Sequence, residues 1–151
     1  MIIKLNEKTV KIQIFDTGGL ENFQEIRRTY YKGAIGVLLV YDITRRETFI
    51  NVTKYLEEIK HKIPELNIII LIGNKKNLEN KRIEVSFEEG KSFAEKNDFI
   101  FCETSVKSNY NIVKDFIKFT QYIYIKKTGS EIFNAKLKDE NDFEIKLTEM
   151  D

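Results

Sequence analysis

The sequence predicts an α/β fold with a mostly parallel sheet flanked by helices. Three short segments are almost entirely apolar, as expected of strands covered on both faces of a sheet: residues 34–41, 67–72 and 99–103. Between them, apolar residues recur at intervals of three and four, which is typical of amphipathic helices. Strands that alternate with helices in this way form parallel sheets, and this alternation defines the predicted class.

Two further strands are predicted before these segments. Residues 2–5 and 10–15 are the candidates, and the polar residues 6–8 suit the turn of a β-hairpin between them. The following segment, residues 21–32, is polar with scattered aromatic side chains. We expect it to form a short or irregular helix.

Capping boxes predict where two helices begin. Thr44 and Glu47 have the Ser/Thr-x-x-Glu spacing that satisfies backbone N–H groups at a helix start, and Pro64 ends the apolar periodicity that follows. Ser86 and Glu89 have the same spacing, and the helix that they open is expected to end near residue 97.

A last helix is predicted to end near residue 127. Its apolar face consists of Ile112, Val113, Phe116, Ile117 and Ile123. Beyond it, few apolar residues are scattered among many charges, which favours disorder. We therefore predict one domain over residues 1–127 and a charged, mostly disordered tail over residues 128–151, with a short strand or helix near residues 143–147.

The composition favours a globular cytoplasmic protein. The 25 Lys and Arg residues nearly balance 24 Asp and Glu residues, so the clustered basic excess of a nucleic-acid-binding surface is not expected. The longest apolar run, residues 68–72, is too short to span a bilayer. Residues 1–4 do not begin a signal peptide, because no long apolar stretch follows them. We expect a monomer with no nucleic-acid partner.

Three polar motifs follow predicted strands. Asp16 and Gly19 form an Asp-x-x-Gly turn of the kind that senses the terminal phosphate of a nucleotide, although this motif alone is common in ordinary turns. Residues 74–77, Asn-Lys-Lys-Asn, follow the second buried strand, and residues 104–107, Thr-Ser-Val-Lys, follow the third. Loops at the carboxyl ends of parallel strands form the ligand crevice, so together the motifs predict a nucleotide site.

In the order and position of these three motifs, the chain resembles the Rab branch of the Ras-like small GTPases. Residues 23–44 (FQEIRRTYYKGAIGVLLVYDIT) carry much of the resemblance. Residues 71–75 (LIGNK) and 103–107 (ETSVK) resemble the family's base-recognition loops. The similarity covers about residues 1–127, beginning at what resembles the family's second strand. It implies a small-GTPase fold, GTP or GDP and Mg²⁺ as cofactors, and a role in vesicle traffic.

The resemblance implies a role for each matching residue on the phosphate side and in the first base-recognition loop. Asp16 would approach Mg²⁺ through a water, and the Gly19 N–H would meet the γ-phosphate. Asn74 would brace its loop, and the stem of Lys75 would pack over the base. Asn77 stands where the family has an Asp that reads the base edge.

The second base-recognition loop and the partner surface follow in the same way. Ser105 would support the loop from which the Val106 N–H meets the base carbonyl, and Lys107 would cover the opposite face of the base. The segment from residue 19 to residue 32 would contact Rab effectors or regulators through three aromatic side chains, which are Phe23, Tyr30 and Tyr31.

Two residues depart from the family in ways that weaken its chemistry. Leu20 stands where the family has the Gln that orients the attacking water, and a leucine has neither donor nor acceptor. No catalytic residue is therefore expected, and hydrolysis should be slow. Asn77 offers one acceptor where a carboxylate would accept from both guanine N–H donors. Weaker guanine binding, or a preference for xanthine, is the consequence.

The phosphate-binding loop, the first strand, the first helix and the first switch segment are not found in the sequence. The fifteen residues before Asp16 contain no glycine, whereas such a loop reads Gly-x-x-x-x-Gly-Lys-Ser/Thr. Gly90-Lys91-Ser92 matches only its end, and Val85 occupies the position of the upstream glycine. Without the first strand, two strand edges would lose their partner. No cysteine follows Cys102, so a prenyl anchor is not expected, and endomembrane recruitment would depend on partners.

Three hypotheses remain open from the sequence. The first is a Rab-like GTPase homologue that binds GTP weakly or not at all and does not hydrolyse it. The second is a non-enzymatic interaction module that binds Rab effectors or regulators without a nucleotide cycle. The third is a mis-started gene product, in which the complete protein is an active GTPase.

Overall fold

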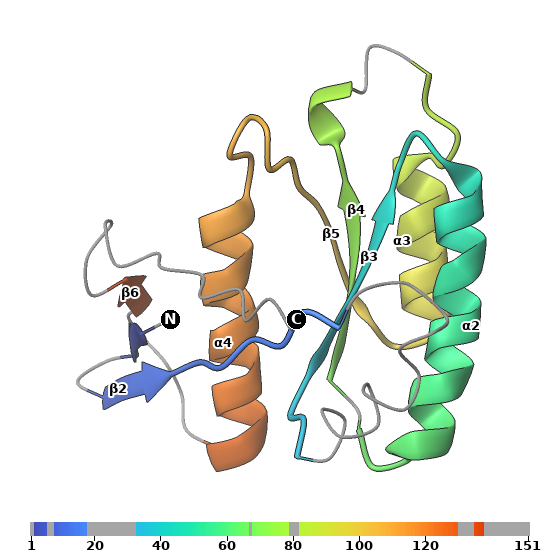
Figure 1. Cartoon of the computed structure of the whole chain (residues 1–151). Helices are drawn as coiled ribbons and strands as arrows, with labels where there is room; N and C mark the ends of the chain where they lie inside the picture. Colours follow the sequence, from blue (N-terminus) through green and yellow to red (C-terminus); the bar gives the residue numbers. More distant parts are fainter. Residues whose placement is uncertain are drawn as a thin grey trace, which may run out of the picture. The chain divides into compact units, whose positions relative to one another are not determined.

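A computed structural model describes residues 2–5, 8–17, 33–66, 68–78, 82–129 and 135–137. The chain forms two compact units (Figure 1). One unit draws on residues 1–33 and 116–151, and the other consists of residues 34–115. The predicted segments 21–32 and 143–147 lie outside the described residues.

The unit of residues 34–115 is a parallel α/β unit, as the sequence predicts. Its sheet has the strand order β3-β4-β5, and both pairings are parallel. Its elements, in chain order, are β3 (Val37–Asp42), α2 (Arg46–Lys62), β4 (Ile69–Asn74), the short 3₁₀ helix η2 (Lys76–Leu78), α3 (Phe87–Lys96) and β5 (Ile100–Glu103).

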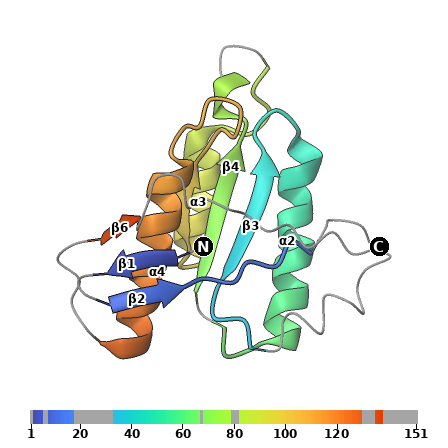
Figure 2. The ribbon, with the colours of Figure 1, turned by 60° about the vertical axis from the view of Figure 1, so that its left-hand side comes forward.

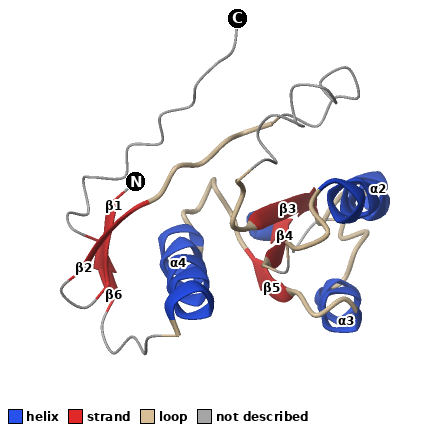
Figure 3. Ribbon diagram, turned by 90° about the horizontal axis from the view of Figure 1, so that it is seen from below, coloured by secondary structure: helices blue, strands red, loops and turns tan. Residues whose placement is uncertain are grey.

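Both helices of this unit pack on the same face of its sheet (Figure 3). Helix α2 lies against β3, and α3 lies against β4 and β5. Three aromatic rings join the two helices to the sheet. Tyr41 of β3 meets Phe49 of α2 with ring centroids 4.9 Å apart, and Phe49 meets Phe93 of α3 at 5.3 Å. This aromatic contact therefore connects α2, α3 and β3 within the core.

The two faces of β3 are buried to different extents. Leu39 and Tyr41 are buried, but Val40 between them is 55% exposed. The prediction of a strand covered on both faces is therefore wrong for β3, because α2 and α3 cover only one face and β3 is an edge strand of its sheet. The central strand β4 is buried from Ile69 to Ile72, as predicted.

The two predicted capping boxes differ in outcome. Ser86 is the N-cap of α3, and its hydroxyl accepts a hydrogen bond from the Glu89 N–H at 3.2 Å, as predicted. The box at Thr44 is wrong, because Arg45 is the N-cap of α2 and provides no side-chain cap. The Thr44 hydroxyl instead donates to the Asp42 carboxylate at 2.7 Å, and a charged acceptor makes that the stronger bond.

The other unit contains a small antiparallel sheet. Strands β1 (Ile2–Leu5) and β2 (Lys8–Lys11) form the predicted hairpin, and β6 (Ala135–Leu137) pairs with the other edge of β1 (Figure 2). The predicted strand over residues 10–15 is wrong in its extent, since β2 ends at Lys11 and residues 12–17 form no regular secondary structure. Strand β6 falls within the segment assigned to the tail.

Helix α4 (Ile112–Thr128) confirms the last predicted helix. Most of its residues belong to the unit of β1, β2 and β6, where the Lys8 ammonium lies 5.8 Å from the centre of the Tyr124 ring. No helix in the part of the chain that the structure describes has the length and apolarity to cross a bilayer.

At Gly90, helix α3 packs closely against side chains of the sheet. A Cβ at this position would overlap the Tyr41 hydroxyl and lie 2.8 Å from a ring carbon of Phe101. We predict that Gly90→Ala lowers the free energy of unfolding by about 1–3 kcal/mol, because overpacking forces these rings to shift.

The matched control is Ser92→Ala, on the exposed side of the same helix. It should change stability by no more than about 0.5 kcal/mol. Urea denaturation followed by circular dichroism measures both variants. Equal stability of Gly90→Ala and the unaltered chain would contradict the close packing of α3 on Tyr41.

Candidate functional site

The loops that follow β4 and β5 meet at one edge of the parallel sheet. Two backbone hydrogen bonds join them. The Thr104 N–H donates to the Gly73 carbonyl at 2.8 Å, and the Lys76 N–H donates to the Thr104 carbonyl at 3.0 Å. Neighbouring parallel strands end at the same edge, which is why residues about 30 positions apart come together here.

A side-chain hydrogen bond links the two loops directly. Ser105 is completely buried, and its hydroxyl donates to Asn77 Oδ1 at 2.6 Å while it accepts from the Ser108 N–H at 3.2 Å. Both functions of the hydroxyl are therefore used. In this arrangement Asn77 Oδ1 is the end of the amide that faces Ser105. The bond thus turns the Asn77 amide nitrogen away from Ser105.

The first loop contains an uncommon backbone conformation. Lys75 has φ 71°, in the left-handed region that few residues other than glycine adopt. Two short-range hydrogen bonds hold it there. The Lys75 N–H donates to Asn74 Oδ1 at 2.7 Å, and the Leu78 N–H donates to the Lys75 carbonyl at 2.8 Å. This places the side chain of Asn74 in a bracing position within its own loop.

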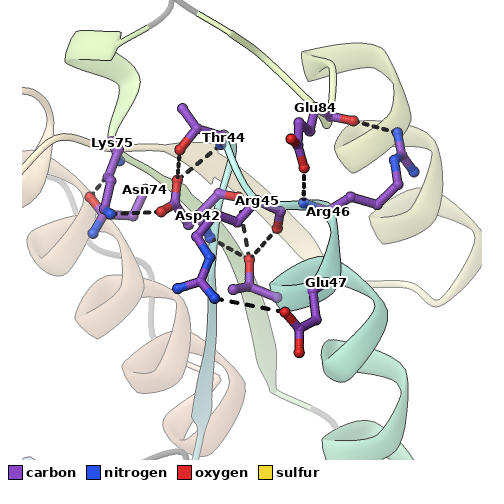
Figure 4. Close-up of polar contacts among 9 residues, drawn as sticks. Asp42, Thr44, Arg45, Arg46, Glu47, Asn74, Lys75 and Glu84 are labelled. Carbon is purple, nitrogen blue, oxygen red and sulfur yellow. Dashed lines mark hydrogen bonds and ion pairs between the residues drawn. The ribbon is translucent and has the colours of Figure 1, made fainter.

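Two consecutive lysines of this loop form ion pairs with the two strands on either side of β4, which are β3 and β5. Lys75 Nζ lies 2.6 Å from Asp42 Oδ2 at the end of β3 (Figure 4). Lys76 Nζ lies 2.8 Å from Glu103 Oε2 at the end of β5. Burial alone would raise the pKa of Asp42, but the hydrogen bonds from Lys75 and Thr44 hold this pKa below its ordinary value.

The second loop presents an exposed turn. Ser105 and Tyr110 exchange two backbone hydrogen bonds, of 3.1 and 2.9 Å, which close the turn between them. At its tip, Val106 is 71% exposed and Lys107 is exposed as well. Both residues therefore lie at the surface, while Ser105 anchors the turn from inside.

The structure brings six of the predicted site residues to this edge: Asn74, Lys75, Asn77, Ser105, Val106 and Lys107. Asp16 is described too, as an exposed residue after β2, and belongs to the other unit. The remaining predicted residues lie outside the described part of the chain: Gly19, Leu20, Phe23, Tyr30 and Tyr31.

Three charged residues of this edge were missed by the sequence analysis: Asp42, Lys76 and Glu103. A signal for Asp42 was present, because it directly follows an apolar strand segment, as Asn74 does. The same rule of polar residues at the carboxyl ends of strands would have found it. Glu103 was assigned to the end of a strand, and nothing in the sequence indicated its pairing with Lys76.

The fold and the paired loops define a class of protein, the α/β proteins whose ligand site lies at the carboxyl edge of a parallel sheet. A family model, described as the Ras family, matches residues 1–125 of the 151. The chain belongs to the Ras family of small GTPase-like proteins, and its parallel α/β sheet with flanking helices is consistent with the family's fold.

The family implies GTP or GDP and Mg²⁺ as ligands in general. The residues of the β4 and β5 edge fit the base of such a nucleotide, because Ser105 and Asn77 join the two loops into one polar surface. In the described ranges no three His, Cys, Asp or Glu side chains cluster as metal ligands. Mg²⁺ held by nucleotide phosphates needs only one or two protein carboxylates, so the lack of such a cluster does not conflict with this ligand.

The bond between Ser105 and Asn77 gives a stability prediction. We expect Ser105→Ala to lower the free energy of unfolding by about 1–3 kcal/mol, since the Ser108 N–H and Asn77 Oδ1 both lose their partner. Ser108→Ala, which removes an exposed hydroxyl three residues away, is the control and should stay within about 0.5 kcal/mol. Urea denaturation measures the stability of both variants. Equal unfolding midpoints for Ser105→Ala and the unaltered chain would show that the bond does not hold the loops together.

Proposed function

We propose that this Ras-family chain is a Rab-like purine-nucleotide-binding regulator of intracellular vesicle traffic. The observation that carries the nucleotide part is the 2.6 Å hydrogen bond from Ser105 to Asn77, which joins the two loops that would read the base. The resemblance of residues 23–44 to the Rab branch supports the trafficking role.

In the proposed complex, the base lies between two lysine side chains. The stem of Lys75 covers one face and Lys107 covers the other, while the Val106 N–H donates to the carbonyl of the base. The exposure of Val106 and Lys107 and the pairing of Lys75 with Asp42 support this arrangement, because each group is at the surface beside the joined loops. Asn77 would meet the remaining edge of the base.

On the phosphate side, Asp16 would approach Mg²⁺ through a water and the Gly19 N–H would meet the γ-phosphate. When bound, Mg²⁺ would supply charge neutralisation at the nucleotide phosphates. The exposed position of Asp16 after β2 supports its part.

The side chain of Asn77 is a reason to expect that guanine binds weakly. Its Oδ1 already accepts the Ser105 hydroxyl, so the amide turns N–H donors outward. Guanine also presents N–H donors at this edge, whereas xanthine presents a carbonyl next to its N–H. The structure therefore favours xanthine over guanine at this position, relative to a chain with aspartate there.

We predict that Asn77→Asp strengthens GTP binding by about tenfold to a hundredfold, the factor for a charged hydrogen bond of about 1.5–3 kcal/mol. The same substitution should weaken XTP binding. Isothermal titration calorimetry with GTP and XTP in the presence of Mg²⁺ measures both. Ser92→Ala, on the exposed side of α3, is the control and should leave both affinities unchanged. Micromolar binding of GTP by the unaltered chain would contradict weak guanine recognition.

Because Leu20 stands at the position of the family's glutamine, any bound nucleotide should be hydrolysed slowly. The family's glutamine orients the attacking water, and a leucine side chain cannot form a hydrogen bond with it. Without that orientation, water attacks in line only rarely. A protein of this kind would stay in its triphosphate state for long periods.

We predict that Leu20→Gln raises single-turnover phosphate release from bound GTP on the order of a hundredfold, the cost of a misplaced reactant. Release is measured at saturating nucleotide, so that affinity does not enter. Leu20→Asn, which is polar but too short to reach the same water, should gain much less. Equal rates for the unaltered chain and Leu20→Gln would contradict the proposed slow enzyme.

Equal rates of phosphate release from the unaltered chain and from Leu20→Gln would favour a second function. This function is a non-enzymatic module that binds Rab effectors or regulators. Leu20 and Asn77 both favour it, because each weakens the nucleotide cycle. Phe23, Tyr30 and Tyr31 would make the contacts. Capture of Rab effectors that persists after Mg²⁺ chelation supports the module, and loss of capture on nucleotide removal overturns it.

A further inference from the structure

Asp42 lies beside the proposed base site and has no role in the nucleotide contacts proposed above. Its carboxylate is held from two directions (Figure 4). Oδ1 accepts the Thr44 N–H at 2.9 Å and the Thr44 hydroxyl at 2.7 Å, and Oδ2 lies 2.6 Å from Lys75 Nζ. The Asp42 side chain is only 11% exposed, and the two bonds from Thr44 hold its carboxylate independently of Lys75.

The pairing with Asp42 determines where the Lys75 side chain points. A lysine ammonium sits on a flexible four-carbon stem, and without a partner it samples many directions. Here the stem runs from the end of β4 toward the end of β3 (Figure 4). A stem already held in one direction loses less conformational freedom when a flat ring packs on it.

The ion pair on the other side of the loop reinforces this arrangement. Lys76 reaches Glu103 at the end of β5 while Lys75 reaches Asp42 at the end of β3. Strand β4 lies between β3 and β5, so the two lysines tie its loop to both neighbouring strands. The loop is therefore held in the left-handed conformation at Lys75 from two opposite directions.

Two other ion pairs in the described residues, Arg45–Glu47 and Lys91–Glu95, lack these features. The Arg45–Glu47 and Lys91–Glu95 pairs are 3.7 Å long, and each partner is more than half exposed. Exposed pairs of this kind contribute little, because solvent screens them and both side chains remain mobile. The pair of Asp42 and Lys75 is shorter, and its carboxylate is nearly buried and already hydrogen-bonded.

We propose that Asp42 is a positioning residue for nucleotide recognition, which directs the Lys75 side chain and fixes the loop after β4 in the conformation that meets the base. This inference rests on the proposed purine-nucleotide function of the same site. Asp42 itself touches no part of the base; it acts through Lys75 and through the backbone that Lys75 belongs to.

The test uses the full chain and measures binding of GTP and XTP by calorimetry. Asp42→Asn should weaken both nucleotides by about twofold to tenfold, the factor for freeing one long side chain. Glu95→Gln is the matched control, because it removes one carboxylate from a lysine pair on the exposed side of α3. It should leave both affinities unchanged.

A double-mutant cycle separates positioning from general stability. In Lys75→Met, which keeps the alkyl stem without the ammonium, Asp42→Asn should cause no further loss of affinity. A merely structural role for Asp42 would weaken binding by the same factor in both backgrounds. That second result would overturn the inference while leaving the proposed function intact.

Hydrogen exchange of the ligand-free chain provides a readout that needs no nucleotide. The Lys76 N–H, bonded to the Thr104 carbonyl, and the Leu78 N–H, bonded to the Lys75 carbonyl, report on the loop. Asp42→Asn should speed exchange at both amides, and Glu95→Gln should not. If the chain binds neither nucleotide, the proposed function fails. Unchanged exchange in Asp42→Asn would then refute the positioning role independently.

Discussion

The parallel register of β3, β4 and β5 is the constraint on which the candidate site depends. It sets Asp42 opposite Asn74 and Glu103 opposite Gly73, so the last residues of all three strands lie at one edge. A shift of one residue would turn each side chain to the other face of the sheet. The continuous burial of β4 between its neighbours resists such a shift and thereby keeps the site together.

The site is rigid where its polar groups are buried and open where it would meet a ligand. Ser105 is fully buried and uses both functions of its hydroxyl, whereas Val106 directly after it is 71% exposed. This contrast lets the core hold the loops in place while their tips stay accessible. The two lysine ion pairs extend the same principle, since each joins a mobile side chain to a buried or half-buried carboxylate.

Helix α2 shows how tertiary contacts replace local ones. Its first N–H group, at Arg46, donates to Glu84 Oε2 at 2.8 Å, and the Arg46 guanidinium binds Glu89 with two hydrogen bonds, of 2.6 and 2.7 Å. The hydrogen bonds from Arg46 and the positive charge of its guanidinium hold the pKa of Glu89 below its ordinary value, although burial acts in the opposite direction. A carboxylate 38 residues away thus does what the local threonine was expected to do.

The sequence by itself determined the α/β class, the alternation of strands and helices, the N-cap at Ser86 and the loops that form the site. These depend on local periodicity and on residues at strand ends, which a linear pattern records. Only the tertiary structure decided that Thr44 and Lys75 share the carboxylate of Asp42 and that one face of β3 stays exposed. Both outcomes depend on which strands become neighbours, and no local pattern specifies that.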